Sequence, residues 1–241
     1  MKKDIIVFDK DGTLMDFDSF WIALSVSAIT DVLKKLNKED VDINLIMKSF
    51  GVENGIVDID GILCKGTYEQ LGMAMYDILK QAGCEKPKDT VLSMIVSAYN
   101  ANMDLGCIKP TCGNIKDVLM KLKNDGRKLV VVTTDNFEST SKCLDELGIR
   151  EFFDMVFTDD GKTPVKPDPH CILEYCKSVG SSPDKMVMVG DTLTDVMFAR
   201  NAGMDIIGVG SNEKSKQLLK LHTDVVIDDI SYIFDALKEV E

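Results

Sequence analysis

Short runs of apolar, largely β-branched residues recur along this chain, and they restrict its fold more than any other feature. Each run is nearly continuous in apolar character, which is typical of strands buried on both faces of a parallel sheet. The runs cover residues 4–8, 128–133, 155–158, 186–190, 205–209 and 224–227. A chain that folds around them needs layers of helix on both sides of the sheet.

Helical patterns separate these runs from residue 113 to the end of the chain. Apolar residues recur at the i, i+3, i+4 and i+7 positions that form one face of a helix, and each stripe stops before a glycine. The stripes are Ile115, Val118, Leu119 and Leu122 before Gly126, Cys143, Leu144 and Leu147 before Gly148, and Ile172, Leu173, Cys176 and Val179 before Gly180. Strands that alternate with helices predict an α/β fold with a Rossmann-like, doubly wound parallel sheet.

The segment between the first and second apolar runs has a different pattern. It carries long helical stripes, such as Phe20, Leu24, Ala28 and Val32, and no convincing strand. We therefore expect a discontinuous core of residues 1–14 and 108–241, with a helical domain of residues 15–107 inserted after the first strand.

Charge and composition exclude several classes of protein. The chain of 241 residues has 28 Lys and Arg against 40 Asp and Glu, a formal charge of −12, so it lacks the basic clusters that bind nucleic acid or anionic membranes. No apolar stretch is long enough for a secretory signal or a membrane span, which favours a cytoplasmic protein. The seven cysteines lack zinc-knuckle spacing and are interpreted as free thiols.

Two carboxylates follow the first predicted strand. Asp9 and Asp11 lie two residues apart in the run Phe8-Asp9-Lys10-Asp11-Gly12-Thr13-Leu14, where Gly12 lets the backbone turn sharply. Ligands of parallel α/β sheets bind at the carboxyl ends of the strands. Taken alone, this pattern is also compatible with a simple turn or a calcium-binding loop.

Further polar residues are predicted at the same edge of the sheet. Thr133 and Thr134 follow the second run, and Asp191 and Asp195 follow the run at 186–190. Lys166 lies between them in a loop that two prolines stiffen. Any one of these has an ordinary structural explanation, but their occurrence in order at successive strand ends favours a catalytic site.

These residues resemble the motifs of the haloacid dehalogenase superfamily, close to its phosphoglycolate phosphatase and β-phosphoglucomutase branch. The resemblance covers the whole chain in order, and the inserted segment falls where this family carries a C1-type helical cap. Residues 9–14 are similar to the first motif, Thr133 to the second, Lys166 to the third, and Asp191 with Asp195 to the fourth.

The resemblance implies a Mg²⁺-dependent phosphoryl transfer. Asp9 would be the nucleophile that forms an aspartyl-phosphate, and Asp11 would protonate the leaving group and later activate water. The Mg²⁺ ligands would be the Asp9 carboxylate, the Asp11 backbone carbonyl and Asp191, with Asp195 behind them to orient water or Lys166.

The resemblance also implies a set of phosphate contacts. Thr133 would donate its hydroxyl to a phosphate oxygen, and Lys166 would place a cation beside the phosphate and the nucleophile. The backbone N–H groups of Lys10, Asp11 and Thr134 would complete this set, although Thr134 stands where the family often has Asn.

The favoured function is a phosphatase that hydrolyses a small phosphorylated metabolite, as phosphoglycolate phosphatase does. A phosphomutase uses the same two aspartates and stays an alternative, as does a non-catalytic regulatory member. The substrate would be selected by the helical cap, where Lys65 is a candidate for contact with an anion. The sequence names neither the substrate nor the oligomeric state.

Overall fold

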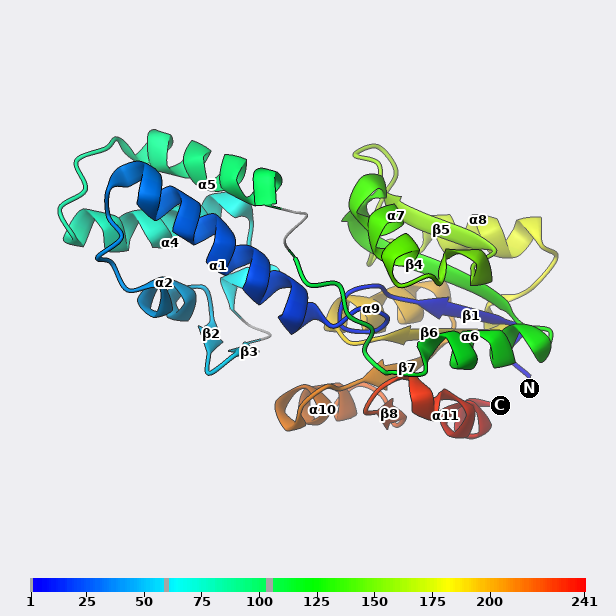
Figure 1. Ribbon diagram of the computed structural model, residues 1–241. Coiled ribbons are helices and arrows are strands. Elements are labelled where there is room, and N and C mark those ends of the chain that lie inside the picture. The colour runs from blue at the N-terminus through cyan, green and yellow to red at the C-terminus, as the bar shows by residue number, and fades with distance from the viewer. Residues whose placement is uncertain (1, 59–60, 103–105) are drawn as a thin grey trace. The chain divides into compact units, whose positions relative to one another are not determined.

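The computed structural model describes residues 2–58, 61–102 and 106–241, except for the side chain of Lys65. The chain divides into two compact units (Figure 1). One comprises Met1–Asp16 and Ile108–Glu241, here called the core unit, and the other is Phe17–Cys107, here called the inserted unit.

The core unit contains a six-stranded sheet in which all pairings are parallel. The strand order is β5-β4-β1-β6-β7-β8, so β1 lies between β4 and β6 near the centre of the sheet. The strands are β1 (Ile5–Phe8), β4 (Lys128–Asn136), β5 (Met155–Asp159), β6 (Met186–Gly190), β7 (Asp205–Val209) and β8 (Val226–Ile227). The α/β prediction with a parallel sheet is confirmed.

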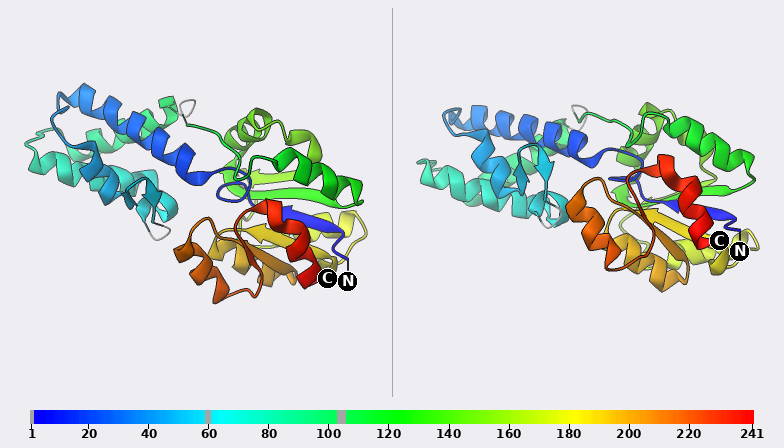
Figure 2. Two further views of the ribbon diagram at one scale, coloured as in Figure 1. Left: turned by 60° about the horizontal axis from the view of Figure 1, so that its bottom comes forward. Right: turned by 90° about the horizontal axis from the view of Figure 1, so that it is seen from below.

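Helices lie on both sides of this sheet (Figure 2). On one side, α8 and α9 bury Ile172, Tyr175 and Phe198 against a core that includes Ile5 and Val7 of β1. The core-unit helices are α6 (Ile115–Asn124), α7 (Phe137–Glu146), α8 (His170–Ser178), α9 (Leu193–Ala202), α10 (Glu213–Lys220) and α11 (Ile233–Val240), with short 3₁₀ turns η2 (Arg150–Phe152), η3 (Pro183–Lys185) and η4 (Ile230–Tyr232).

Two strands differ from the sequence prediction. β4 continues beyond the predicted end at residue 133 to Asn136, so Thr134 also lies within the strand, and the pairing with β5 becomes irregular after Val132. β5 is only partly buried, because it is an edge strand with a neighbour on one side only. The expectation that every strand is buried on both faces was therefore wrong for β5.

The inserted unit is mainly helical, with α1 packed against α5 and α5 against α4. Its helices are α1 (Phe17–Leu36), α2 (Ile43–Ser49), α3 (Ile62–Lys65), α4 (Tyr68–Gln81) and α5 (Lys88–Asn102). The expectation of no strand here was wrong, since β2 (Val52–Glu53) and β3 (Ile56–Val57) form a short antiparallel hairpin. The connecting Asn54 and Gly55 both have positive φ, which is the conformation of a tight hairpin turn.

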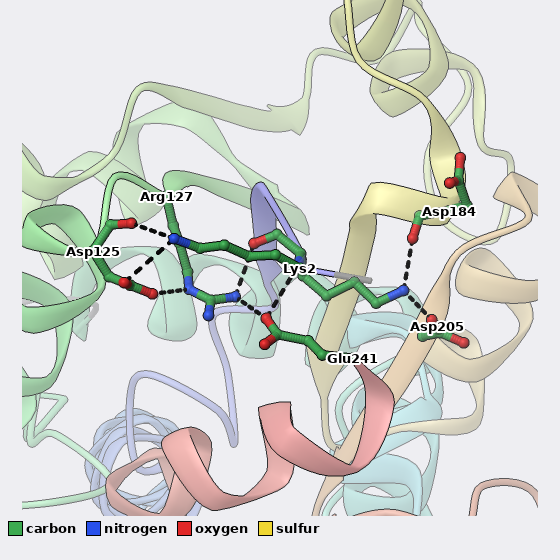
Figure 3. A network of polar contacts seen from close by, with 7 residues as sticks. Lys2, Asp125, Arg127, Asp184, Asp205 and Glu241 are labelled. Carbon is green, nitrogen blue, oxygen red and sulfur yellow. Dashed lines mark hydrogen bonds and ion pairs between the residues drawn. The ribbon is translucent and has the colours of Figure 1, made fainter.

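A network of charged side chains at the amino edge of the sheet connects residues near the two ends of the chain (Figure 3). Glu241 accepts hydrogen bonds from the backbone N–H of Lys3 at 3.0 Å and from Arg127 at 2.5 Å. Arg127 also binds Asp125 at 2.8 Å, and the Lys3 ammonium contacts Asp205. These charges are satisfied by one another, which gives them a structural role.

No helix in the described part of the chain is long and apolar enough to cross a membrane.

Candidate active site

Asp9 is the first residue after β1, and its carboxylate is almost completely buried. Its backbone N–H donates to the carbonyl of Val189 on the neighbouring strand β6, at 2.9 Å. The Lys166 ammonium binds one carboxylate oxygen of Asp9 and also lies 2.7 Å from Asp195. The buried ammonium of Lys166, which lies in a loop, thereby joins the end of β1 to the start of α9.

Asp195 is fixed by the start of α9. Its second carboxylate oxygen accepts from the backbone N–H of Thr192 at 3.0 Å and from the Thr192 hydroxyl at 2.6 Å. The Thr192 hydroxyl in turn accepts from the Asp195 N–H, which completes a capping box. Since both oxygens of Asp195 are engaged, one with Thr192 and one with Lys166, this carboxylate is suited to hold Lys166 in place.

Asp191 directly follows β6 and approaches the turn at Gly12. A Cβ atom at Gly12 would lie 2.1 Å from a carboxylate oxygen of Asp191, and Gly12 has a φ of +74°. Both the backbone conformation and the space therefore require glycine at this position. Ligand atoms of Asp9, Asp191 and Asp195 all lie within 4.8 Å of one another.

The crowding of buried acids shifts their titration. The pKa of Asp9 is raised to about 7, mainly because burial disfavours the charged form; the Lys166 ammonium opposes this shift, and the nearby Asp195 and Asp11 add to it. Burial and the neighbouring carboxylate of Asp9 raise the pKa of Asp191 well above its ordinary value. For Lys166, burial opposes the charged form, but Asp195 and Asp9 outweigh it and the pKa rises.

A divalent cation fits this group of acids. Carboxylate oxygens are the protein ligands that Mg²⁺ prefers, and a cation would relieve the repulsion that raises the pKa of Asp9 and Asp191. The sequence-based choice of Asp9 and Asp191 as ligands agrees with their proximity, while their role in holding a metal stays a prediction.

Asp11 lies at the start of the turn and belongs to a second cluster, whose side-chain contacts sequence reasoning missed. Its carboxylate lies 2.8 Å from the Lys10 ammonium, and this ammonium also lies 3.0 Å from Asp135 of β4. Sequence reasoning gave Lys10 only a backbone role and Asp135 none. A lysine between the two motif aspartates was the only available signal, because nothing local links it to residue 135.

Thr133 is buried within β4, whereas Thr134 is exposed. The Thr133 hydroxyl accepts from the backbone N–H of Asp135 at 3.1 Å, so in this structure it is engaged with its own strand. The structure thus joins Asp9, Lys166 and Asp195 directly and places Asp191 near them, whereas the roles of Thr133 and Thr134 stay predictions. The Lys65 side chain lies outside the described part of the chain.

Comparison with known proteins gives relatives of nearly the same length. The chain is 29% identical over 248 residues to a phosphoglycolate phosphatase of Psychrobacter arcticus, covering 98% of this chain and 96% of that one. It is 28% identical over 229 residues to the pyrophosphatase PpaX of Bacillus velezensis, covering 94% and 92%.

Solved structures share the fold at lower identity. A candidate β-phosphoglucomutase of Thermotoga maritima matches with a TM-score of 0.70 and 21% identity, over 100% of both chains. The haloacid dehalogenase-like protein YfnB of Bacillus subtilis matches with a TM-score of 0.65 and 17% identity, over 99% of this chain and 100% of that one. Its crystal structure contains YfnB bound to magnesium.

A family model matches a span that contains all four motifs. The haloacid dehalogenase-like hydrolase model aligns with residues 3–203, which include Asp9, Thr133, Lys166, Asp191 and Asp195. The parallel sheet, the joined acids at its carboxyl edge and this match agree, and the chain belongs to the haloacid dehalogenase-like hydrolases.

Proposed function

We propose that the protein is a Mg²⁺-dependent phosphatase that hydrolyses a small phosphorylated metabolite through an aspartyl-phosphate on Asp9. The observation that carries this proposal is the buried Lys166 ammonium bound by Asp9 and Asp195, with a carboxylate oxygen of the partly buried Asp191 within 4.8 Å of theirs. It combines a nucleophile, a fixed cation and acidic metal ligands at the carboxyl edge of the sheet.

In the first step, a carboxylate oxygen of Asp9 attacks the phosphorus and the bond from phosphorus to the leaving oxygen breaks. An anionic nucleophile approaches an anionic phosphate only where positive charge offsets the repulsion, and Lys166 supplies part of that charge. Burial of Asp9 strengthens this interaction because little water screens it.

Asp11 is proposed to carry the proton in both steps. It gives its proton to the leaving oxygen when Asp9 attacks, and it then accepts a proton from the water that attacks the phosphorus of the intermediate. The second step breaks the bond between Asp9 and phosphorus, so Asp9 and Asp11 return to their initial states and phosphate is released.

The Asp9 carboxylate, the Asp11 backbone carbonyl and Asp191 would hold Mg²⁺. When bound, the cation would neutralise charge on the phosphate and on the crowded acids. Asp195 would keep Lys166 directed at Asp9, as its hydrogen bonds to Thr192 and Lys166 support.

The phosphate oxygens would be bound by the Thr133 hydroxyl, by Lys166 and by the backbone N–H groups of Lys10, Asp11 and Thr134. For Thr133 to act, its hydroxyl must turn its proton toward the ligand, which is compatible with the hydrogen bond that it accepts from Asp135.

The relatives indicate the substrate class and leave its identity open. One is a phosphoglycolate phosphatase and the other a pyrophosphatase, so the leaving group differs between them. We take phosphoglycolate as the first candidate because that relative covers more of this chain. The inserted unit is proposed to act as the cap that selects the leaving group.

The test is phosphate release, with MgCl₂, from 2-phosphoglycolate, pyrophosphate, glucose 1-phosphate and p-nitrophenyl phosphate. Turnover of at least one substrate that requires Mg²⁺ and is lost in Asp9→Asn supports the proposal. Interconversion of a phosphosugar without net phosphate release would instead identify a mutase. No turnover of any compound in the panel would contradict both.

A further inference from the structure

The side chain of Lys10 occupies an unusual position for a lysine. It is 1% exposed and reaches two carboxylates, with its ammonium 2.8 Å from Asp11 and 3.0 Å from Asp135. Burial opposes its charged form, but Asp11 and Asp135 outweigh burial and keep the pKa above the ordinary value. Lys10 is therefore a buried cation with two fixed partners.

One of these partners is anchored to the sheet. Asp135 lies in β4, and its other carboxylate oxygen accepts from the backbone N–H of Asn136 at 2.8 Å. Asp11, in contrast, lies in the turn after β1, although its side chain is 22% exposed, nearly the same as the 20% of Asp135. The ammonium thus links a residue held by the sheet to a carboxylate in the turn that follows β1.

A purely stabilising role explains this arrangement poorly. Desolvation of a buried ammonium offsets most of the attraction to its partners, so buried ion pairs contribute little net stability compared with apolar side chains of similar size. An apolar residue at position 10 would fill the same space. The retained charge points instead to control of the direction of the Asp11 carboxylate.

We propose that Lys10 is a positioning residue that holds the carboxylate of Asp11 in the direction needed for proton transfer to the leaving group, using Asp135 as its anchor. This inference rests on the proposed function, in which Asp11 is the acid and base. It gives Lys10 a side-chain role in addition to any contact of its backbone N–H with phosphate.

The effect of a Lys10 variant on kcat should depend on the leaving group if Lys10 positions Asp11, and should not depend on it if Lys10 only supports the structure. An alkyl phosphate such as 2-phosphoglycolate needs a proton on its leaving oxygen, whereas p-nitrophenyl phosphate releases an anion that is stable without one. Loss of a well-placed acid therefore slows the first substrate far more than the second. A general loss of structure slows both equally.

The experiment measures kcat and KM for both substrates in Lys10→Met, Lys10→Arg and Asp135→Asn. We expect Lys10→Met to lower kcat for 2-phosphoglycolate about 10- to 100-fold, the scale of a small misplacement of a catalytic group. The kcat for p-nitrophenyl phosphate should change less than about threefold, with KM nearly constant. Lys10→Arg should recover most of the loss, because it keeps the charge.

Asp135→Asn removes the anchor and leaves Lys10 in place, so it should show the same selectivity for the alkyl substrate. If Lys10→Met does not fold, Asp135→Asn alone tests the proposal. The matched control is Lys177→Met, which removes an exposed lysine paired with Glu174 in α8 and should change neither rate.

The reference variant is Asp11→Asn. The role of Lys10 can be judged if the parent turns over both substrates and Asp11→Asn lowers kcat mainly for 2-phosphoglycolate. In that case the role is overturned if Lys10→Met and Asp135→Asn lower kcat equally for both substrates, or lower neither. If the parent has no phosphatase activity, or Asp11→Asn shows no selectivity, the proposed role of Asp11 fails and the inference fails with it.

Discussion

The core unit and the inserted unit differ in what they bury. The core unit buries side chains with ionisable groups, including Asp9, Lys10, Lys166 and Asp195. In the described part of the inserted unit, the buried polar side chains are Ser25 and Asn102, both neutral. Each has hydrogen-bond partners, Ser25 with Tyr99 at 2.7 Å and Asn102 with Asp31 at 2.9 Å.

This difference indicates that the core unit carries the chemistry, whereas the polar groups buried in the inserted unit serve its packing. A buried charge costs free energy unless other groups compensate for it, so a protein keeps such charges mainly where they have a use. In the core unit the acids and lysines compensate one another at the edge where the phosphate is proposed to bind. The inserted unit is stabilised by apolar helix faces, and changes there should affect stability more than the chemical step.

The largest expected effect is on the nucleophile. Asp9→Asn removes the attacking carboxylate and should lower kcat for p-nitrophenyl phosphate by at least about 1,000-fold, as for other nucleophile variants. Phosphate release under saturating Mg²⁺ measures it, and circular dichroism checks that the variant is folded. A rate within tenfold of the parent would refute the nucleophile assignment.

Asp191→Ala should weaken the response to Mg²⁺. Loss of a ligand should raise the Mg²⁺ concentration for half-maximal activity by about 10- to 100-fold, the scale seen when the support of a metal site is lost. A titration of activity against Mg²⁺ measures the shift. Asp184→Asn, at the amino edge of the core unit, is the control, and an unchanged midpoint in Asp191→Ala would remove Asp191 from the ligand set.

Stabilisation by Mg²⁺ should increase with pH. In the metal-free protein burial raises the pKa of Asp9 to about 7 and also raises that of Asp191, so between about pH 4 and 7 the folded state binds more protons than the unfolded chain. The free energy of unfolding without metal then falls as the pH rises through this window. Mg²⁺ replaces those protons and contributes more at pH 8 than at pH 5.

Thermal unfolding with and without Mg²⁺ measures this dependence. At about 100 times the dissociation constant the cation should add about 2.7 kcal/mol at pH 8, which corresponds to a Tm increase of about 5 to 10 °C. At pH 5 the increase should be less than half as large. An equal increase at both pH values would show that protons and Mg²⁺ do not compete for these acids.

The smallest effect on activity should come from the inserted unit. Tyr99→Phe leaves the buried Ser25 hydroxyl without its partner and should lower the free energy of unfolding by about 1 to 3 kcal/mol. The kcat for p-nitrophenyl phosphate should stay within about twofold. Urea unfolding and steady-state kinetics measure both, with Tyr76→Phe as the control at a partly exposed site in α4. If Tyr99→Phe lost activity while its free energy of unfolding stayed unchanged, the assignment of chemistry to the core unit and packing to the inserted unit would be wrong.

The sequence alone determined the parallel sheet and the inserted, mainly helical segment, and it predicted the candidate site residues. Continuous apolar runs and helical stripes are local patterns, and each reports the burial of its own element. Parallel strands deliver their carboxyl ends to one edge, so Asp9 and Asp191 could be expected together before any contact was known. The motif spacing then indicated the family that the comparison confirmed.

Only the tertiary structure decided how the site's charges are paired. The link from Lys10 to Asp135 joins residues far apart in the chain, and no local pattern encodes which lysine meets which carboxylate. The same holds for the continuation of β4 beyond Thr133, where Asn136 pairs with Asp159 of β5. It holds also for the β2–β3 hairpin, whose strands are too short to show a periodicity. Local patterns determine elements, whereas long-range packing determines the partners of each buried charge.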